Sequence, residues 1–414
     1  MTKLQPVRGT RDILPAEAAA MRRVAEVARG IASRYGYQEM ATPIFEFTEV
    51  FKRTLGDTTD VVTKEMYTFD DRNGDSVTLR PEGTAGVARA LISGGLSQHL
   101  PLRYYYEGPM FRYERPQKGR FRQFHQVGVE LLGEPGPEAD VEVIAVGAHI
   151  LDELGIAGDV ILELNSLGDS ESRAAYRDVL VGYFAAHRDA LSADSRLRLE
   201  RNPLRILDSK DPDDRGIVSA APDFSGSFNN ASADYFAKVR EGLDELAIAY
   251  TVNPRLVRGF DYYCHTAFEF TTERLGSQGA VIAGGRYDGL VELMGGPATP
   301  GTGWASGIER LAMMMGGPPP GPRPIAVIPV GEDAGPVARR TANTLRRVGF
   351  AVRLDLRGNL NKRMKRANGA NACAAVIIGS DELARDAATV RDLDSGDQSE
   401  AMLDRLADAL ANYR

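Results

Sequence analysis

The residues best suited to chemistry lie between Phe111 and Glu130, where an Arg-Pro-Gln-Lys-Gly turn separates two strand-like stretches. Alternate residues of a strand share a face, so Arg112 and Glu114 would lie together on the first stretch. On the second, the residues in register are Arg120, Arg122, Phe124, Gln126, Gly128 and Glu130. This row of guanidinium, amide and carboxylate groups, with room above the glycine, predicts an antiparallel hairpin. We expect it to form the floor of a site for a small charged ligand, with arginine aimed at phosphate or carboxylate.

Four other stretches could complete such a site. Glu82 and Thr84 offer a carboxylate for an ammonium group and a hydroxyl, although, taken alone, a turn with a helix cap is the more common reason for such residues. The tyrosine-rich stretch 258–263 is also compatible with a bulged strand and core tyrosines. The glycine-rich stretch 284–289 lets backbone approach a ligand or forms a tight hairpin. The stretch 301–310 reads as a glycine-spaced strand entering a helix, whose final arginine is otherwise a surface cation.

The sequence lacks the common nucleotide-binding loops. It contains no Gly-x-x-x-x-Gly-Lys-Ser/Thr motif, and no Gly-x-Gly-x-x-Gly follows the first strand. A nucleotide would therefore have to be held by arginines on an antiparallel sheet.

Composition indicates a soluble globular protein of two or three domains, since 414 residues are 43% hydrophobic and 26% charged. No run of about 18 apolar residues predicts a membrane span, and the N-terminus lacks the apolar region of a signal peptide. Cys264 and Cys373 are far apart and the five histidines are scattered, so no metal motif appears. Such cysteine usage favours a reducing compartment, the cytoplasm.

Charge is distributed unevenly along the chain. The net charge of −7 argues mildly against nucleic-acid binding over the whole surface. Residues 323–414 carry 15 Lys and Arg against 12 Asp and Glu, whereas the remainder carries 35 against 45. The basic run Lys362–Arg366 lies in this last segment. It permits a domain that contacts phosphates, or it is a solvated helix face.

The elements expected to position these residues follow from local patterns. Helices are expected at 15–35, 85–93 and 138–154, and strands at 39–46, 77–79, 256–272 and 281–283. Pro43 inside the first strand indicates an edge or an interface. Residues 55–75 look like a mobile loop. From Ser170 to Ser225 the helical spacing predicts an insertion.

A proline- and glycine-rich linker at 316–324 marks the sharpest boundary. Beyond it, strands at 325–330, 351–356, 373–379 and 387–393 are expected with helices at 335–348, 359–369 and 399–412. This alternation predicts a small α/β domain with a largely parallel sheet.

In this order the motifs resemble those of class II aminoacyl-tRNA synthetases. Pro43 with its preceding helix resembles motif 1, Arg112 and Glu114 resemble motif 2, and 307–310 resembles motif 3. Stretches 258–263 and 284–289 resemble the two signatures peculiar to histidyl-tRNA synthetases.

The resemblance implies an α+β catalytic domain built on an antiparallel sheet, the class II synthetase fold, with a helical insertion and a C-terminal α/β anticodon-binding domain. The expected boundaries are 1–169 and 226–316 for the catalytic domain, 170–225 for the insertion, 317–324 for the linker and 325–414 for the anticodon-binding domain. A homodimer formed through motif 1 is expected.

The implied reaction joins L-histidine to tRNA-His through a histidyl-adenylate made from ATP, with Mg2+ bridging phosphates. By resemblance, Arg112 would hold the α-phosphate and Arg310 the far phosphates, while Glu114 and Arg120 would orient the adenine. Arg258 would sit against the histidine carboxylate and the α-phosphate. No dedicated protein metal site is expected.

The resemblance also implies roles in binding histidine and tRNA. Glu130 and Tyr263 would contact the imidazole, and the residues assigned to the ammonium group and to closing the pocket are Glu82, Thr84, Gln126 and Tyr287. The turn residues Arg115, Gln117 and Lys118 would meet the tRNA acceptor end. The alternative is a non-catalytic regulatory subunit of ATP phosphoribosyltransferase, a paralogue without an anticodon domain.

Overall fold

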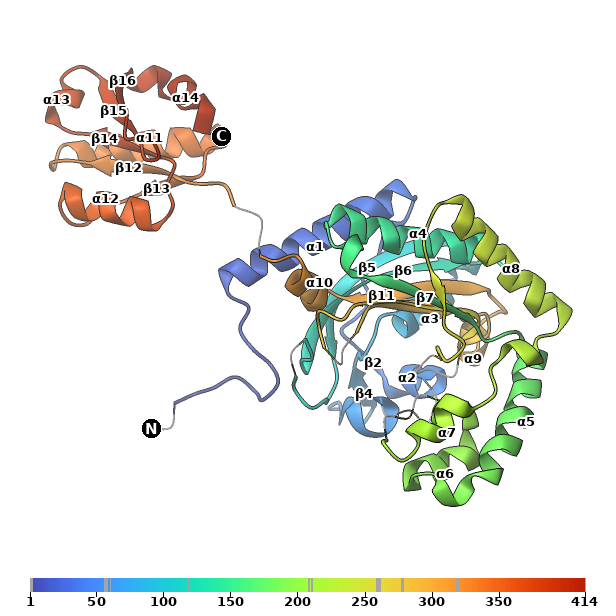
Figure 1. Ribbon diagram of the computed structural model, residues 1–414. Helices are drawn as coiled ribbons and strands as arrows, with labels where there is room; N and C mark the ends of the chain where they lie inside the picture. Colours follow the sequence, from blue (N-terminus) through green and yellow to red (C-terminus); the bar gives the residue numbers. More distant parts are fainter. Residues whose placement is uncertain are drawn as a thin grey trace. The chain divides into compact units, whose positions relative to one another are not determined.

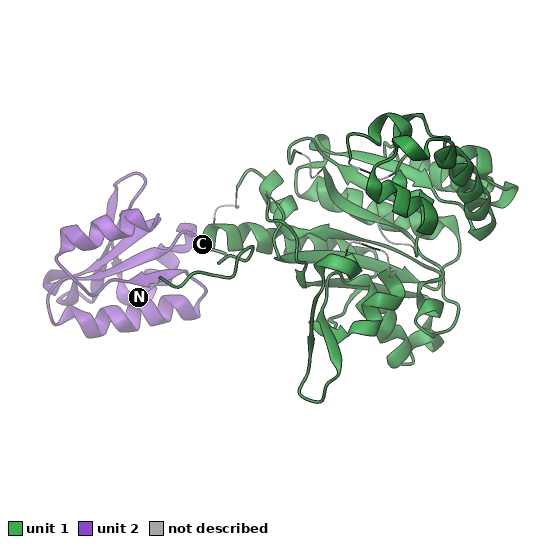
Figure 2. Cartoon of the chain, turned by 90° about the horizontal axis from the view of Figure 1, so that it is seen from below, with its two compact units in different colours: residues 1–318 green, residues 319–414 purple. Residues whose placement is uncertain are grey.

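The computed structural model describes residues 3–55, 59, 61–117, 119–207, 209, 211–257, 262–276, 279–317 and 321–413. The chain forms two compact units, Met1–Pro318 and Pro319–Arg414 (Figure 2). Each unit has its own hydrophobic core.

An eight-stranded sheet organises the first unit (Figure 1). Its strands, in spatial order, are β1 (Gln38–Glu39), β5 (Leu102–Phe111), β6 (Gln123–Leu132), β11 (Gly301–Gly307), β10 (Ala280–Arg286), β9 (Cys264–Thr271), β7 (Ile161–Ser166) and β8 (Thr251–Val252). The six central strands pair antiparallel, and only the two-residue edge strands β1 and β8 pair parallel. The hairpin expected around residues 111–130 is therefore the β5–β6 pair, although its regular pairing ends at Phe111 and Gln123.

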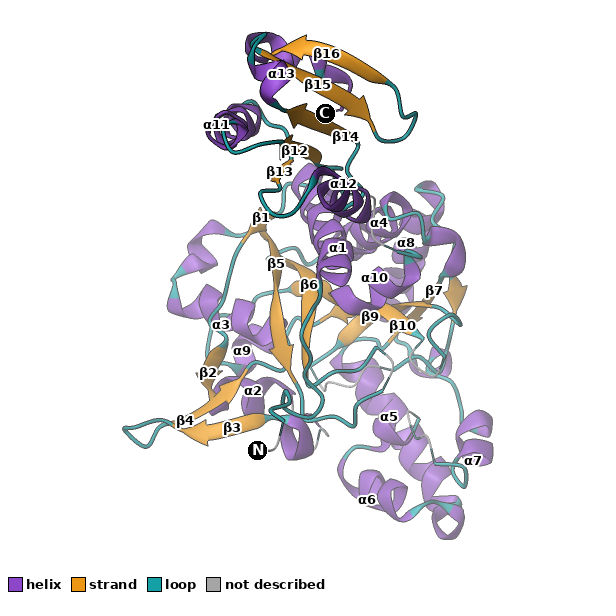
Figure 3. Cartoon of the chain, turned by 90° about the vertical axis from the view of Figure 1, so that its left-hand side faces the viewer, coloured by secondary structure: helices purple, strands orange, loops and turns teal. Residues whose placement is uncertain are grey.

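Residues of one face of the sheet pack under four helices. Tyr105, Val127, Val129 and Leu131 follow the two-residue period of a strand and are buried in one cluster. The helices that cover this face are α1 (Pro15–Arg34), α4 (Pro137–Glu153), α8 (Asn230–Glu245) and α10 (Ile308–Met314). Figure 3 shows these four helices grouped on one side of the strands. The expected helices at 15–35 and 138–154 are confirmed.

The opposite face carries the residues that alternate with these, among them Tyr106 and Leu132. It packs against α2 (Thr48–Leu55), α3 (Thr84–Ser93) and α9 (Leu290–Leu293). The chain segments before α2 and between α2 and α3 form a second, three-stranded sheet. Its strands, in spatial order, are β2 (Phe45–Phe47), β4 (Ser76–Leu79) and β3 (Tyr67–Asp70). The polar residues of the predicted hairpin share this second face.

The segment after β7 is helical, as expected. Its helices α5 (Ser170–Ala186), α6 (Ala193–Arg201) and α7 (Arg215–Ala220) enclose a separate cluster around Tyr176, Phe184 and Phe224. The buried Asp214 carboxylate accepts hydrogen bonds from the hydroxyls of three residues, Ser192, Ser195 and Ser209. These bonds tie the start of α6 to the loop before α7.

The second unit contains a five-stranded sheet in the order β13 (Val352–Leu354), β12 (Ile325–Pro329), β14 (Ala374–Ile378), β15 (Ala387–Asp392) and β16 (Gln398–Met402). Helices α11 (Ala334–Arg347) and α12 (Leu360–Gly369) pack on opposite faces, because alternate β12 residues belong to different core clusters. Short helices α13 (Ser380–Leu383) and α14 (Leu406–Ala409) follow.

Three expectations about secondary structure are wrong. The helix expected at 399–412 is replaced by β16 and short helical turns, since Asp392 and Gly396 close a hairpin that pairs β16 antiparallel with β15. The sheet is therefore half parallel and half antiparallel. The loop expected at 55–75 contains a π-helical turn, Val61–Glu65, and strand β3. The strand expected at 39–46 is divided between two sheets, with Pro43 between β1 and β2.

Candidate active site

The polar residues of β6 face α3 in the centre of the sheet. Gln126 is 8% exposed and Glu130 is fully buried. Glycines on neighbouring strands make space for them, because a Cβ on Gly303 would collide with the Glu130 carboxylate. The space above Gly128, where we expected a ligand, is filled by the ring of Tyr106 from β5. That expectation needs correction, since any ligand must lie beside this ring.

Glu82 and Thr84 connect the start of α3 to this floor. The Glu82 carboxylate accepts hydrogen bonds from the backbone N–H groups of Thr84 (2.6 Å) and Ala85 (2.9 Å), so it caps the helix. The Thr84 hydroxyl donates to Glu130 Oε1 at 2.7 Å, away from its own helix. The helix cap and the cluster of polar groups are thus both present, and the cap is formed by the glutamate.

Glu130 is held between two hydroxyl donors. Besides Thr84, the Tyr287 hydroxyl donates to its Oε2 atom. Burial raises the pKa of Glu130 to about 8, and the hydrogen bonds from Thr84 and Tyr287 offset only part of that effect. A further hydrogen-bond donor or cation beside this carboxyl group would lower its pKa again and favour the charged form.

Three tyrosines form the remaining wall. The ring centroid of Tyr287 lies 5.8 Å from that of Tyr262 and 6.4 Å from that of Tyr263, both edge to face. All three side chains are almost fully buried. Tyr263 and Tyr287, which we expected in a pocket with Glu130, are brought together by the structure.

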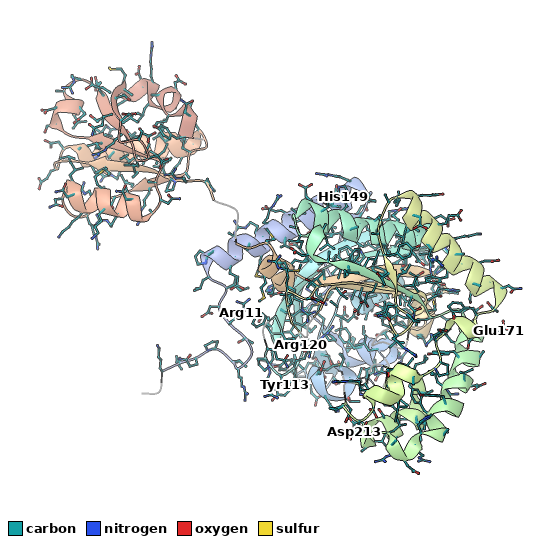
Figure 4. The ribbon with its side chains drawn as sticks, viewed as in Figure 1. Arg11, Tyr113, Arg120, His149, Glu171 and Asp213 are labelled. Atoms are coloured by element: carbon teal, nitrogen blue, oxygen red, sulfur yellow. The ribbon has the colours of Figure 1, made fainter. Side chains whose placement is uncertain are left out.

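Several arginines lie near these polar residues, just beyond the end of β5. Arg112 donates from Nε to the carbonyl of Pro81 (2.8 Å), the residue before Glu82. Its Nη1 lies 3.9 Å from Glu114, and Arg120 Nε lies 2.7 Å from the other oxygen of that carboxylate. Figure 4 labels Arg120 and Tyr113 in this part of the first unit. Arg112 and Glu114 lie just beyond β5, so loop contacts and not strand pairing place them.

Arg310 completes the cationic group from the first turn of α10. Its Nη1 donates to the carbonyl of Ala280 (2.7 Å), and its Nε donates to that of Gly119 (3.3 Å). Burial lowers its pKa, and the nearby charges of Arg120 and Arg112 act in the same direction. Arg310 is therefore held in place as part of a cluster and is not a solvated surface cation.

Two predicted contacts fall outside the described residues. These are Arg258, in the segment 258–261, and Lys118 in the β5–β6 turn. Arg115 and Gln117 of the same turn are exposed. Reciprocal backbone hydrogen bonds between Gln117 and Arg120 (3.2 and 2.9 Å) close the turn.

Sequence reasoning missed the ion pair beneath the glycine-rich stretch. Arg286 is fully buried and pairs at 3.0 Å with Asp140 of α4, which is also buried. A Cβ on Gly284 would collide with Gly303 and Trp304 of the next strand. Gly284 therefore lets β10 and β11 lie close together, whereas a Cβ on Gly285 would approach the ring of Tyr263. An arginine at the end of an otherwise apolar strand was the available signal.

Glu309 was also missed. Its carboxylate accepts hydrogen bonds from the His125 backbone N–H, at 3.0 Å from each oxygen, and Oε1 lies 2.9 Å from His125 Nδ1. The side chain is 4% exposed. Because Gln126 follows His125 and Arg310 follows Glu309, this contact fixes the ammonium and phosphate parts of the expected site relative to each other.

We expect Glu309→Ala to lower the free energy of unfolding by about 2 kcal/mol, because it leaves the His125 N–H buried without an acceptor. Urea denaturation of the purified variant measures this change. Glu292→Ala, on the exposed face of α9, is the control and should change the free energy by less than about 0.5 kcal/mol. Equal stability of the two variants would contradict a stabilising role for the contact between Glu309 and His125.

In the part of the chain that the structure describes, no three His, Cys, Asp or Glu residues come together to hold a metal ion. None of the described helices combines the length and apolarity needed to cross a bilayer.

Comparison with known proteins agrees with this architecture. The family model described as "Histidyl-tRNA synthetase" matches residues 9–311, and that described as "Anticodon binding domain" matches residues 324–413. The chain is 60% identical to the histidine--tRNA ligase of Rhodospirillum rubrum over 414 residues, 100% of both chains. It is 56% identical to that of Gluconacetobacter diazotrophicus over 411 residues, 99% of both. The crystal structure of apo S. aureus histidyl-tRNA synthetase matches with a TM-score of 0.83 at 34% identity, covering 99% of both chains.

The large antiparallel-rich sheet and the separate α/β unit are those of a class II aminoacyl-tRNA synthetase. The matches extend over both units and most of their length. The chain belongs to the histidyl-tRNA synthetase family.

Proposed function

We propose that this chain joins L-histidine to tRNA-His in an ATP-dependent reaction, through a histidyl-adenylate, with release of AMP and pyrophosphate. One observation carries the proposal. A buried cluster of polar side chains around Glu130 adjoins Arg112, which donates to the carbonyl of Pro81, the residue before Glu82. A substrate seated there would present its side chain to the pocket and its carboxylate to the arginines.

The pocket suits the polar ends of histidine. An imidazole ring has a donor and an acceptor nitrogen, and the wall formed by Glu130 and Tyr263 offers hydrogen-bonding groups of both kinds. The ammonium group would be held by Glu82, Thr84 and Gln126, with Tyr287 closing the pocket. In support, the Gln126 Oε1 atom is buried and has no hydrogen-bond partner among the described residues.

The arginine cluster suits a triphosphate. Attack of the histidine carboxylate on the α-phosphate builds negative charge, which Arg112 would stabilise electrostatically. Arg310 would hold the far phosphates, and Glu114 and Arg120 would orient the adenine. For Arg258, assigned to the carboxylate and the α-phosphate, the resemblance alone supports the role.

Mg2+ would enter this site with ATP. Such ions are usually held by substrate phosphates with one or two carboxylates. Glu114 and Glu269 are the acidic residues whose charges act on Arg310, so they are the candidates to face a phosphate-bound ion. When bound, the ion would neutralise charge on the phosphates.

The second unit would contact tRNA. A depression of about 500 Å³ is lined by Arg353 of β13 and by Lys362, Lys365 and Arg366 of α12. Arg366 pairs with Asp355 at 2.5 Å, which leaves the two lysines as the more available cations. Lysines in such a depression suit contact with phosphates, which position RNA without reading its sequence. The exposed turn residues Arg115 and Gln117, together with Lys118, are assigned to the acceptor end.

Reversing both lysines, Lys362→Glu with Lys365→Glu, should lower kcat/KM for tRNA charging by at least about 10-fold and reduce its dependence on salt. Histidine-dependent ATP–pyrophosphate exchange should not change, because it needs no tRNA. The matched control, Arg22→Glu with Lys238→Glu, makes the same change in net charge on the exposed surface of the first unit. A double reversal that charges tRNA normally would rule out this depression as an RNA contact.

A homodimer is supported by exposed apolar side chains around Pro43. Ile44, Phe45, Phe47 and Phe69, on and next to strands β2 and β3, are 45–60% exposed. An apolar group of this kind at the edge of a small sheet is typical of a surface covered by a partner. We place the protein in the cytoplasm, consistent with its two free cysteines.

The alternative, a regulatory subunit of ATP phosphoribosyltransferase, is less well supported. Arg112 and Arg310 are both present, and residues 324–413 match an anticodon-binding domain. An assay of [14C]histidine transfer to tRNA-His by the full chain tests the choice. Charging supports the ligase. No charging, together with stimulation of an added ATP phosphoribosyltransferase catalytic subunit, would favour the alternative.

A further inference from the structure

The short segment before α1 packs against the loop that joins β5 to β6. Regular pairing of these strands ends at Phe111 and Gln123, so contacts with other elements must hold the loop in shape. The loop carries Glu114 and Arg120, the two residues assigned to the adenine of ATP. Figure 4 labels Arg11 of the segment and Arg120 of the loop in the same part of the first unit.

A turn in this segment, at residues 7–10, supplies a backbone acceptor to the loop. The Thr10 backbone N–H donates to the carbonyl of Val7 (2.8 Å), and the carbonyl of Gly9 accepts from the backbone N–H of Arg122 (2.8 Å). Gly9 has a φ of +88°, and a Cβ at this position would collide with Cγ and Cδ of Arg122. The segment therefore needs glycine here to approach the loop this closely.

Arg122 connects this turn to the residues assigned to the adenine. Its guanidinium lies over the ring of Tyr113, 3.7 Å from the centroid, and its Nε donates to the carbonyl of Glu114 (3.2 Å). The Glu114 carboxylate in turn pairs with Arg120 at 2.7 Å. The position of Arg122 therefore bears on where both residues lie.

Arg11 adds a side-chain contact between the segment and the loop. Its guanidinium lies over the ring of Phe121, 4.1 Å from the centroid, and pairs with Glu17 in the first turn of α1. In the sequence, Phe121 stands between Arg120 and Arg122. Because α1 packs into the core of the first unit, Arg11 links the loop to a rigid element.

We propose that Arg11 is a positioning residue for ATP, which holds the loop in the shape that presents Glu114 and Arg120 to the adenine. It acts through the ring of Phe121 and not by touching substrate. This inference rests on the proposed function, because it concerns the ATP side of the same site. Without the contact, the loop would adopt the binding-competent shape less often, and the apparent affinity for ATP would fall by the same factor. The surroundings of Glu130 would not change, since this residue belongs to the regularly paired part of β6.

The test compares two KM values in histidine-dependent ATP–pyrophosphate exchange. Arg11→Gln should raise the KM for ATP about 5- to 20-fold, the range expected when one cation–π contact and one partly exposed ion pair are lost. It should leave the KM for histidine within about 2-fold, a separation that a general loss of stability would not produce. Arg11→Lys keeps a cation between Glu17 and the ring of Phe121, so it should restore most of the affinity for ATP.

A control and a double-mutant cycle show whether the effect passes through the ring. Arg8→Gln is the matched control, because Arg8 is an exposed arginine of the same turn and the change in net charge is identical. Its KM for ATP should stay within about 2-fold of the wild type. Combining Arg11→Gln with Phe121→Leu should raise the KM for ATP no further than the more damaging single substitution does, because both remove the same contact.

Three results would overturn the proposal while leaving the proposed function intact. These are an unchanged KM for ATP in Arg11→Gln, an equal rise in the KM for ATP and for histidine, and independent, multiplying effects of the two substitutions in the cycle. Failure of the wild type itself to catalyse histidine-dependent exchange would instead reject the proposed function, and this proposal with it.

Discussion

Arg112→Gln is expected to reduce the rate of histidine-dependent ATP–pyrophosphate exchange by about 10²- to 10³-fold. Losing one preorganised donor to developing charge commonly has an effect of this size. Arg112 is held by the Pro81 carbonyl and lies over the ring of Phe124, at 5.4 Å from its centroid. Its guanidinium is therefore positioned before substrate arrives. Steady-state exchange kinetics at saturating histidine and ATP measure the loss.

The control for this variant is Arg103→Gln on the same strand. Arg103 pairs with Glu142 at 2.8 Å near the other end of β5, away from the cluster. It should keep an exchange rate within about 3-fold of the wild type, with only a small loss of stability. Similar rates for the two variants would show that Arg112 does not act on the reacting phosphate.

Glu130→Gln should have the second large effect, a rise in the KM for histidine of about 10³-fold or more. A site built to hydrogen-bond a substrate side chain discriminates by large factors when that pairing is lost. The glutamine keeps the shape and can still accept from Thr84, but it cannot supply the charge. Exchange assays over a wide range of histidine concentrations would measure the change. A variant with normal KM would remove Glu130 from the imidazole pocket.

The same substitution changes how stability depends on pH. The pKa of Glu130 is about 8 in the folded chain and near its ordinary value of 4.5 when the side chain is exposed. Between these values the folded state binds more protons than the unfolded state, so the free energy of unfolding falls as pH rises. This contribution is complete below about pH 4.5 and lost above about pH 8. Urea denaturation between pH 5 and pH 8 should show the decline in the wild type, and Glu130→Gln should lack it.

Much of the first unit was predictable because its signals are local. The helix expected at 15–35 appears as α1, with Pro15 at its first position. The glycine-spaced strand running into a helix at 301–310 appears as β11 and α10. Gln126, Gly128 and Glu130 share a face because the two-residue period of a strand requires it. Local period and turn chemistry were sufficient for these elements.

The side chain that fills the space above Gly128 could not be predicted from the sequence of one strand alone. Tyr106 fills the space above Gly128 because β5 pairs with β6 in one particular register. That register is a property of the pair. The contact of Glu309 with His125 likewise joins residues 184 positions apart. Long-range pairs of this kind leave no period or spacing in the sequence.

The mistaken helix at 399–412 has a different cause. Residues 399–412 are rich in Ala and Leu at helical spacing, which favours a helix locally. The Asp392 carboxylate instead accepts from the backbone of Asp394 and Ser395, and Gly396 adopts a positive φ of 82°. This turn directs the next residues back along β15. Pairing in the sheet overrode the helical propensity for the first four residues of the segment.

The central claim is that the pocket beside the arginine cluster activates histidine with ATP. Pyrophosphate exchange measured separately with each of the twenty amino acids, at fixed Mg2+ and without tRNA, tests it most directly. The account predicts exchange with histidine alone, because Glu130 and the surrounding hydroxyls pair only with a ring that both donates and accepts. Exchange with another amino acid, or with none, would contradict it.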